Sequence, residues 1–269
     1  MRSDSVLSMS KFSSEKFLKR DTKDKDGFGE LIRTFVYAVL IAVGIRSLAY
    51  EPFNIPSESM LPTLLVGDFV FVSKLTYGYS RFSFPFGKLP LPKNRVLGDM
   101  PERGDVAVFR LPSNTKINYI KRIVGLPGDR IQIKGGILFI NGVAVKKERL
   151  GEFAHTNRYG QTVRTPEFRE TLPSGKSYLT LDISSNTVND NTKLFVVPPG
   201  HYFAMGDNRD NSTDSRVSAR DGGVGFLPAE NLVGRADIIW YSTASAEPFY
   251  IIWDVLLKTR LERFLQLIE

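Results

Sequence analysis

The chain has 269 residues, of which 42% are hydrophobic, with 22 glycines and 15 prolines, a composition typical of one large or two small folded domains rich in loops. The formal charge is +7, but Lys and Arg are scattered and no nucleic-acid-binding motif is present, so a membrane surface fits the charge better than nucleic acid. The absence of cysteine excludes disulfides and thiolate chemistry, and two histidines, His155 and His201, argue against a histidine-rich metal site.

The N-terminal region contains one long apolar segment. Residues 1–30 are rich in Ser, Lys and Asp without sustained periodicity, which predicts a disordered polar tail. Residues 31–50, LIRTFVYAVLIAVGIRSLAY, would extend about 30 Å as a helix, the thickness of a bilayer core. Arg33 and Arg46 interrupt the segment, so a span requires both side chains to reach the headgroups. We expect an uncleaved transmembrane anchor; a buried core helix and a cleavable signal peptide are the alternatives.

The orientation of such an anchor follows from the basic residues before and within its first turn, because Lys and Arg are retained on the cytoplasmic side. These are Arg2, Lys11, Lys16, Lys19, Arg20, Lys23, Lys25 and Arg33. The tail is therefore expected in the cytoplasm, and residues 51–269 on the periplasmic or extracellular side.

From residue 69 onward the pattern predicts β structure. Short segments rich in β-branched and aromatic residues are bounded by Gly, Pro, Asn or Asp, and they cover residues 69–74, 105–111, 119–125, 131–146, 193–198, 201–207 and 236–242. Gly135-Gly136 and Asn141-Gly142 are signals for hairpin turns. We expect a mainly β domain at 51–269, with antiparallel sheets forming a barrel-like core.

Two segments depart from this pattern. Residues 146–192 are polar and weakly patterned, which indicates a polar subdomain inserted into the β core. Residues 249–268 place apolar residues near helical spacing but include five charged ones. An amphipathic helix that docks or lies at an interface is expected there, in preference to a second span.

Two serines, Ser57 and Ser59, lie in the proline-bracketed stretch IPSESMLPTLLVGD at 55–68. A serine nucleophile needs a base, because the hydroxyl alone is too weakly acidic to attack at neutral pH. The two histidines lie outside any G-x-S-x-G motif, so a Ser-His-Asp hydrolase is disfavoured. S-x-x-K occurs three times, but without S-D-N or K-T-G, so the penicillin-binding class is rejected.

A lysine is the other available base. In NYIKRIVGLPGDRI at 118–131, strand alternation places Lys121 and Ile123 on one face and Ile120 and Arg122 on the other. Burial on an apolar face lowers the pKa of a lysine from about 10.4, which makes its amine a usable base near neutrality. An exposed strand lysine is the alternative.

Five segments, in order along the chain, resemble the type I signal peptidases of bacteria, which are membrane-anchored serine proteases that remove signal peptides from exported preproteins. They are the apolar segment, IPSESMLPTLLVGDFVFVSK (55–74), RGDVAVFRLP (103–112), YIKRIVGLPGD (119–129) and GDNRDNSTDSR (206–216). Each segment alone is a weak signal. The ordered set covers the anchor and most of the β core.

The resemblance implies roles for individual residues. It makes Ser59 the nucleophile and Lys121 the general base. The Ser57 hydroxyl would join the Ser59 backbone N–H in an oxyanion hole, where donors lower the barrier. Ser212 would hydrogen-bond and orient the lysine.

The last segment would also supply support. By resemblance, Asp214 and Arg216 form an ion pair beside the site, while Asp207, Asn208 and Arg209 correspond to turn and scaffold residues. No metal or cofactor is required by a serine–lysine mechanism.

The expected activity is therefore cleavage of N-terminal signal peptides at the membrane surface. The expected partners are signal-peptide-bearing preproteins and the lipid bilayer, with no nucleic acid, and the expected location is the bacterial inner (cell) membrane as a single-pass protein. By the same resemblance, Phe53, Ile55 and Ile120 are candidates for the shallow apolar walls of a pocket for small substrate side chains. Two alternatives are a non-catalytic membrane-anchored β-domain that binds exported proteins and a serine–lysine protease that cuts itself or a regulatory protein.

Overall fold

The structure is a computed structural model that describes residues 22–80, 82, 95–156, 160–244 and 257–269. Its contacts divide the chain into two compact units, Met1–Ile45 and Arg46–Glu269. The second unit contains all the strands that the structure describes.

The helix α1 runs from Thr22 to Leu48. The predicted tail is therefore helical from 22 to 30, which corrects the prediction of disorder there. Large apolar side chains are exposed along this helix, namely Phe28, Leu31, Ile32, Phe35, Val36, Tyr37, Val39, Leu40, Ile41 and Val43. In the part of the chain that the structure describes, no helix combines the length and apolar character needed to cross a membrane. The predicted span at 31–50 is not confirmed.

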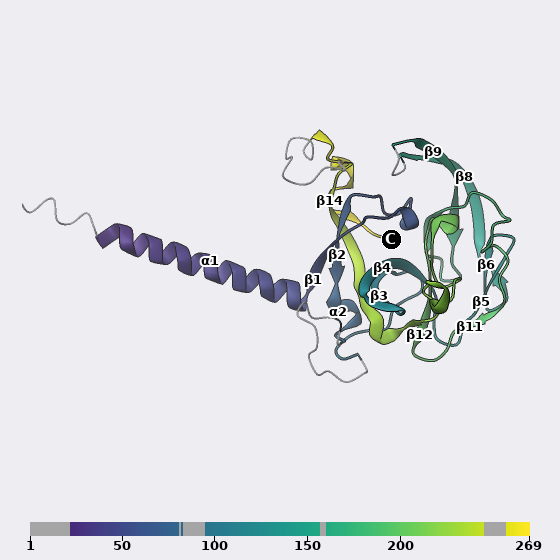
Figure 1. Ribbon diagram of the computed structural model, residues 1–269, viewed down its shortest axis with the longest axis horizontal. Coiled ribbons are helices and arrows are strands. Elements are labelled where there is room, and N and C mark those ends of the chain that lie inside the picture. The colour runs from purple at the N-terminus through teal and green to yellow at the C-terminus, as the bar shows by residue number, and fades with distance from the viewer. Residues whose placement is uncertain (1–21, 81, 83–94, 157–159, 245–256) are drawn as a thin grey trace, which may run out of the picture. The chain divides into compact units, whose positions relative to one another are not determined.

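The largest sheet of the second unit is antiparallel and has eight strands, several of which are labelled in Figure 1. Its order is β1-β2-β14-β3-β4-β12-β13, and β15 adds to β14. The strands are β1 (Tyr50–Asn54), β2 (Asp68–Ser73), β3 (Val106–Leu111), β4 (Asn114–Gly125), β12 (His201–Met205), β13 (Leu227–Pro228), β14 (Leu232–Ser242) and β15 (Gln266–Leu267). Among the described strands this pairing does not close into a ring, so the mainly β, antiparallel prediction is confirmed but the barrel-like closure is not.

A four-stranded sheet contains the predicted hairpins. Its order is β11-β5-β6-β7, with β5 (Arg130–Lys134), β6 (Ile137–Ile140), β7 (Val143–Ala144) and β11 (Phe195–Val196). Gly135 and Gly136 have φ of 55° and 72°, and Asn141 and Gly142 have φ of 54° and 85°. Both turns therefore use the left-handed conformations that two-residue hairpins need, as predicted.

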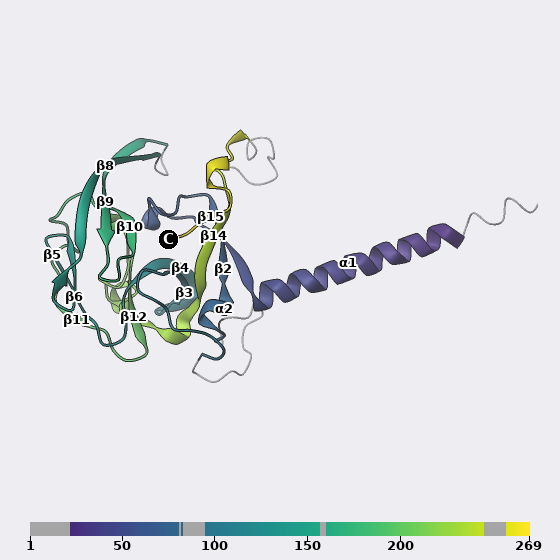
Figure 2. The same ribbon diagram turned by 180° about the vertical axis from the view of Figure 1, so that it is seen from behind.

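The predicted insertion folds as a three-stranded antiparallel sheet. Its strands are β8 (Lys146–Thr156), β9 (Thr162–Thr171) and β10 (Ser177–Leu181), in the order β10-β9-β8, and Figure 2 shows β8, β9 and β10 beside β5 and β6. The helix α2 (Lys74–Tyr77) and the short 3-10 helices η1 (Glu58–Met60), η2 (Arg209–Asn211), η3 (Ala219–Asp221), η4 (Ala229–Asn231) and η5 (Leu261–Arg263) lie in the connections.

The prediction of a C-terminal amphipathic helix is wrong for residues 258–268. Residues 249–256 lie outside the described residues, Leu257 is helical, and the remainder contains η5 and β15. β15 pairs with Ile238 and Ile239 of β14, and the Arg263 guanidinium donates to both carboxylate oxygens of Asp68, at 3.1 and 2.7 Å. Backbone pairing with β14 and this ion pair favour an extended segment over a helix. The helical spacing of apolar residues in the sequence does not reveal such tertiary contacts.

Candidate active site

Ser59 lies in η1, between β1 and β2. Three apolar neighbours, Ile55, Met60 and Leu64, are buried in one core cluster, and burial of each such side chain contributes about 1.5–3 kcal/mol. Backbone hydrogen bonds from Ile55 N to Asp68 O (2.8 Å) and from Gly67 N to Ile55 O (3.0 Å) close the loop at its base. A three-residue turn is thereby held in one conformation, with Ser59 only 9% exposed.

Lys121 lies opposite Ala107 in the β3–β4 ladder and is 4% exposed. Its Nζ donates to Ser59 Oγ at 2.6 Å and to the carbonyl of Ile120 at 2.9 Å. The two residues are 62 positions apart in the chain. The structure therefore brings together the two residues that the resemblance implied as nucleophile and base, and Lys121 is buried as strand alternation suggested.

The surroundings of Lys121 favour its neutral amine. Burial is the largest influence and lowers its pKa to about 8, against the opposing effects of the Asp214 and Asp207 carboxylates; Arg216 adds to the lowering. A reduction of this size corresponds to about 3 kcal/mol of preference for the neutral form. An amine with this pKa, 2.6 Å from a hydroxyl, is suited to accept the hydroxyl proton near neutral pH.

A cavity of about 390 Å³ opens at the serine–lysine pair. All three predicted pocket residues, Phe53, Ile55 and Ile120, line it, as do Ser57, Ser59 and Lys121. The other lining residues were not predicted; they are Asn54, Pro56, Val108, Ile117, Asn118, Tyr119, Asn211 and Thr213. Ile117 and Tyr119 lie four and two positions before Lys121 in β4, so strand alternation could have indicated that they share its face.

Ser57 lies close enough to act with Ser59, since their Oγ atoms are 3.3 Å apart. Ser212 is also buried at the site, but its Oγ makes no hydrogen bond to any described residue. The orienting contact from Ser212 to Lys121 that the resemblance implied is therefore not seen here, although Ser212 packs beside the pair. At Gly206, an added Cβ would overlap Ser212 and lie 2.5 Å from the Ser59 carbonyl oxygen. The absence of a side chain at Gly206 therefore leaves room for Ser212 and the Ser59 carbonyl to lie against its backbone.

Asp214 and Arg216 form the expected ion pair. The Arg216 guanidinium donates to both Asp214 oxygens, each at 2.9 Å, and Asp214 also accepts the Gly206 N–H at 3.0 Å. Burial raises the pKa of Asp214, but the charge and hydrogen bonds of Arg216 outweigh it and the pKa is lowered. The carboxylate is therefore ionised and its charge is balanced within the pair.

Comparison with known proteins identifies the family of the chain. The family described as signal peptidase, peptidase S26, matches residues 28–241. The chain belongs to this family. Among curated relatives, a signal peptidase I of Rickettsia typhi is 40% identical over 234 residues, which cover 84% of this chain and 85% of the relative, and one of Rickettsia akari is 42% identical over 214 residues, or 77% of each. The chain is thus an enzyme, a peptidase of the signal peptidase I type, and the non-catalytic alternative is set aside.

A solved signal peptidase I from Enterococcus faecalis is 27% identical and covers 51% of this chain and 97% of its own, with a TM-score of 0.28. That score is too low to carry an argument about the fold.

Two further residues of this signal peptidase family member, Asn208 and Asp207, were expected only as turn and scaffold residues, and Asn208 holds the serine turn. Asn208 donates its side-chain amide to the Glu58 carbonyl at 3.0 Å, and its backbone N–H to the Ser59 carbonyl at 3.1 Å. Asp207 accepts both Arg122 Nε (2.9 Å) and a terminal nitrogen (2.8 Å). Arg122, between the apolar residues Ile120 and Ile123 beside Lys121 in β4, was the available signal for such a partner.

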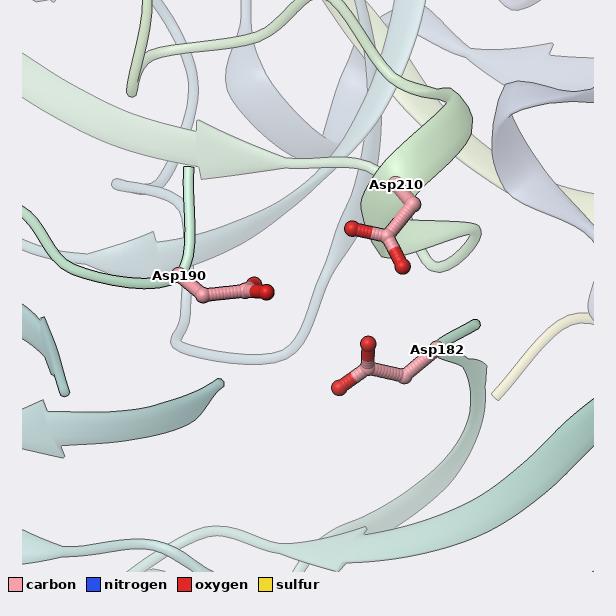
Figure 3. A group of neighbouring side chains, drawn as sticks. All are labelled: Asp182, Asp190 and Asp210. Carbon is pink, nitrogen blue, oxygen red and sulfur yellow. The ribbon is translucent and has the colours of Figure 1, made fainter. Parts of the chain in front are cut away.

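Three carboxylates, Asp182, Asp190 and Asp210, are the one group of described residues whose spacing could suit a metal ion (Figure 3). Asp182 pairs with Lys147, and Asp210 accepts the N–H groups of Ile183 at 2.8 Å and Ser184 at 3.3 Å. Asp190 accepts the N–H of Thr187 at 2.5 Å. These contacts explain the cluster as an anchor of the 183–190 loop.

Proposed function

We propose that this chain cleaves N-terminal signal peptides from exported preproteins, with Ser59 as nucleophile and Lys121 as general base. The observation that carries the proposal is the 2.6 Å contact between Ser59 Oγ and a buried lysine whose pKa is lowered to about 8. The names of the relatives, signal peptidase I, support the substrate class.

The chemistry follows from the two side chains. Neutral Lys121 accepts the Ser59 proton while Oγ bonds to the scissile carbonyl carbon; the resulting ammonium then donates the proton to the departing amine as the C–N bond breaks. Lys121, neutral again, takes a proton from water as its oxygen bonds to the ester carbonyl carbon of the acyl-enzyme, and returns that proton to Ser59 Oγ as the ester C–O bond breaks and the second product leaves. One lysine therefore serves both half-reactions.

The oxyanion formed during attack needs donors. The Ser57 hydroxyl, 3.3 Å from Ser59 Oγ, and the Ser59 backbone N–H are the proposed pair. Removal of one donor of this kind costs about 3–4 kcal/mol of transition-state stabilisation. Phe53, Ile55 and Ile120 line the adjacent cavity, and we propose that a small apolar substrate side chain before the cleaved bond packs against them.

Membrane attachment is part of the proposal. The exposed apolar residues of α1 support anchoring in the bacterial inner (cell) membrane, with the N-terminus cytoplasmic and residues 51–269 on the opposite side. A nucleophile tethered shortly after an anchor meets membrane-bound signal peptides at high effective concentration. Alkaline extraction of membranes and protease protection of the N-terminal tail test attachment and orientation, respectively.

The decisive experiment incubates detergent-solubilised full-length protein with a purified preprotein. We expect cleavage by the wild type and none by Ser59→Ala or Lys121→Ala. Lys146→Ala is the matched control, because this lysine side chain is 68% exposed and should be dispensable. Cleavage at wild-type rate by Lys121→Ala would refute the pair, and self-cleavage without preprotein cleavage would favour the alternative protease.

A further inference from the structure

A buried ion pair joins the inserted sheet to the segment 206–216. Glu170 in β9 is 1% exposed and Arg209 in η2 is 3% exposed, and the two terminal nitrogens of Arg209 donate to the two Glu170 oxygens at 2.6 and 2.7 Å. Tyr178, directly opposite Glu170 in β10, donates its hydroxyl to the same carboxylate at 3.0 Å. Burial lowers the pKa of Arg209, but the Glu170 charge outweighs it and raises that pKa. Arg209 is therefore a cation held by the insertion.

Arg209 in turn holds both ends of the segment 206–216. Its Nε donates to the Gly206 carbonyl at 3.2 Å, and its own carbonyl accepts a terminal N–H of Arg216 at 2.5 Å. Arg216 is the partner of Asp214, which binds the Gly206 N–H. Loss of the Glu170 contact would leave an uncompensated buried guanidinium, a strongly unfavourable state that the segment can relieve only by moving.

That segment supports the serine–lysine pair in two ways. Asn208 binds the carbonyls of Glu58 and Ser59, so it sets the position of the nucleophile turn. Asp214 and Arg216 are among the charges that determine the pKa of Lys121, in opposite directions. A shift of this segment would change both the approach of Ser59 and the basicity of Lys121.

A second route leads from the same sheet. The Tyr178 ring lies 4.2 Å from the Arg122 guanidinium, which binds Asp207. The backbone N–H of Leu181, the last residue of β10, donates to the Asp207 carbonyl at 2.9 Å. Two strands of the insertion, β9 and β10, thus contact neighbouring residues of the segment 206–216.

We propose that Glu170 is a positioning residue for the reaction: through Arg209 it fixes the segment 206–216, and the inserted sheet is thereby part of the active-site scaffold. This inference rests on the proposed roles of Ser59 and Lys121. It gives the insertion a function in the catalytic step, one that its polar, weakly patterned sequence did not indicate.

The test is Glu170→Gln in the full-length, detergent-solubilised protein, because glutamine keeps the size of the side chain but removes the charge. We expect kcat to fall on the order of 10- to 100-fold, the effect of a small misplacement of reacting groups, with KM changed much less. The acidic limb of the kcat/KM pH profile should move to lower pH, since an unbalanced Arg209 charge disfavours protonated Lys121. Glu148→Gln, in the same insertion with a side chain 46% exposed, is the matched control and should behave as wild type.

Unchanged kcat and an unchanged pH profile in Glu170→Gln would overturn the inference, as would a lower Tm accompanied by wild-type kcat and profile in the folded protein. If Glu170→Gln does not fold, Tyr178→Phe decides, because it removes one donor to Glu170 and keeps the ring on Arg122; a smaller fall in kcat with KM little changed supports the inference, and wild-type kinetics overturn it. Ser59→Ala separates the two proposals. If Ser59→Ala cleaves the preprotein at the wild-type rate, the proposed function is refuted. If Ser59→Ala is inactive and Glu170→Gln has wild-type kinetics, only the role of Glu170 is refuted.

Discussion

The pH dependence of kcat/KM is the most direct test of Lys121 as a base. Its pKa of about 8 means that the reactive neutral amine is half populated at that pH. At pH 7 roughly one-tenth of the free enzyme, and at pH 6 roughly one-hundredth, holds the neutral form. We therefore expect kcat/KM to fall about tenfold for each pH unit below 8 and to level off above it, because a free-enzyme group governs this parameter.

The assay measures initial rates on a soluble peptide that carries a signal-peptide cleavage site, from pH 6 to 9.5 at constant ionic strength. Asp214→Asn serves as the diagnostic variant. The Asp214 carboxylate raises the pKa of Lys121, so its neutralisation should move the acidic limb to lower pH, whereas a base unrelated to Lys121 would be unaffected. A profile that is flat across this range in the wild type, or a limb that Asp214→Asn leaves in place, would refute the assignment.

Three other predictions concern single side chains. Ser57→Ala should lower kcat about 10²- to 10³-fold with little change in KM, as expected for a donor that acts on the transition state; steady-state kinetics check this, and an equal rise in KM would contradict it. Gly206→Ala should lower kcat by about 10²-fold or more, because the added carbon meets Ser212 and the Ser59 carbonyl; rates comparable to wild type would show that the close packing is not needed. Lys121→Met should raise Tm at pH 7. The pKa of Lys121 in the folded protein lies below its value in the unfolded chain. The free energy of unfolding is therefore highest above about pH 10.4, where the amine is neutral in both states, and falls by up to about 3 kcal/mol as the pH drops to 8. Methionine removes this loss, so thermal unfolding at pH 7 should show a higher Tm than wild type, and a lower Tm would contradict the prediction.

The strands and hairpins of the β unit could be predicted because their signals are local. Alternation of β-branched residues marked β2, β3, β4 and β14, and the Gly-Gly and Asn-Gly pairs marked two turns whose backbone conformation few other residues adopt. The strands of the insertion were harder to predict. β8 and β9 expose many of their residues, so the apolar alternation that identifies a strand is weak there.

The C-terminal segment shows why a period can mislead. Its apolar residues have helical spacing, but Arg263 binds Asp68, which lies 195 positions earlier in the chain, and β15 completes the edge of β14. Neither partner is visible in a local window. Tertiary pairing overrides local preference in such cases.

Residues of the site could be predicted only where the sequence shows a motif or a charged residue in an apolar run. Lys121 and Arg122 are adjacent charges within the largely apolar run 119–125 of β4, and both prove to be buried with specific partners. Which partners they have depends on the order of strands in the sheet, because β12 lies beside β4 and delivers the segment 206–216 to it. That order is a property of the whole unit and cannot be derived from any one segment.

The arrangement of charges explains how a buried lysine can be a base beside two buried carboxylates. Each of these, Asp207 and Asp214, is bound through both oxygens by its own arginine, Arg122 and Arg216. Because each negative charge is largely balanced within its pair, the carboxylates raise the pKa of Lys121 less than burial lowers it. In the proposed mechanism, Arg122 and Arg216 would therefore assist catalysis indirectly, because by balancing the two carboxylates they leave burial as the main influence on the pKa of Lys121.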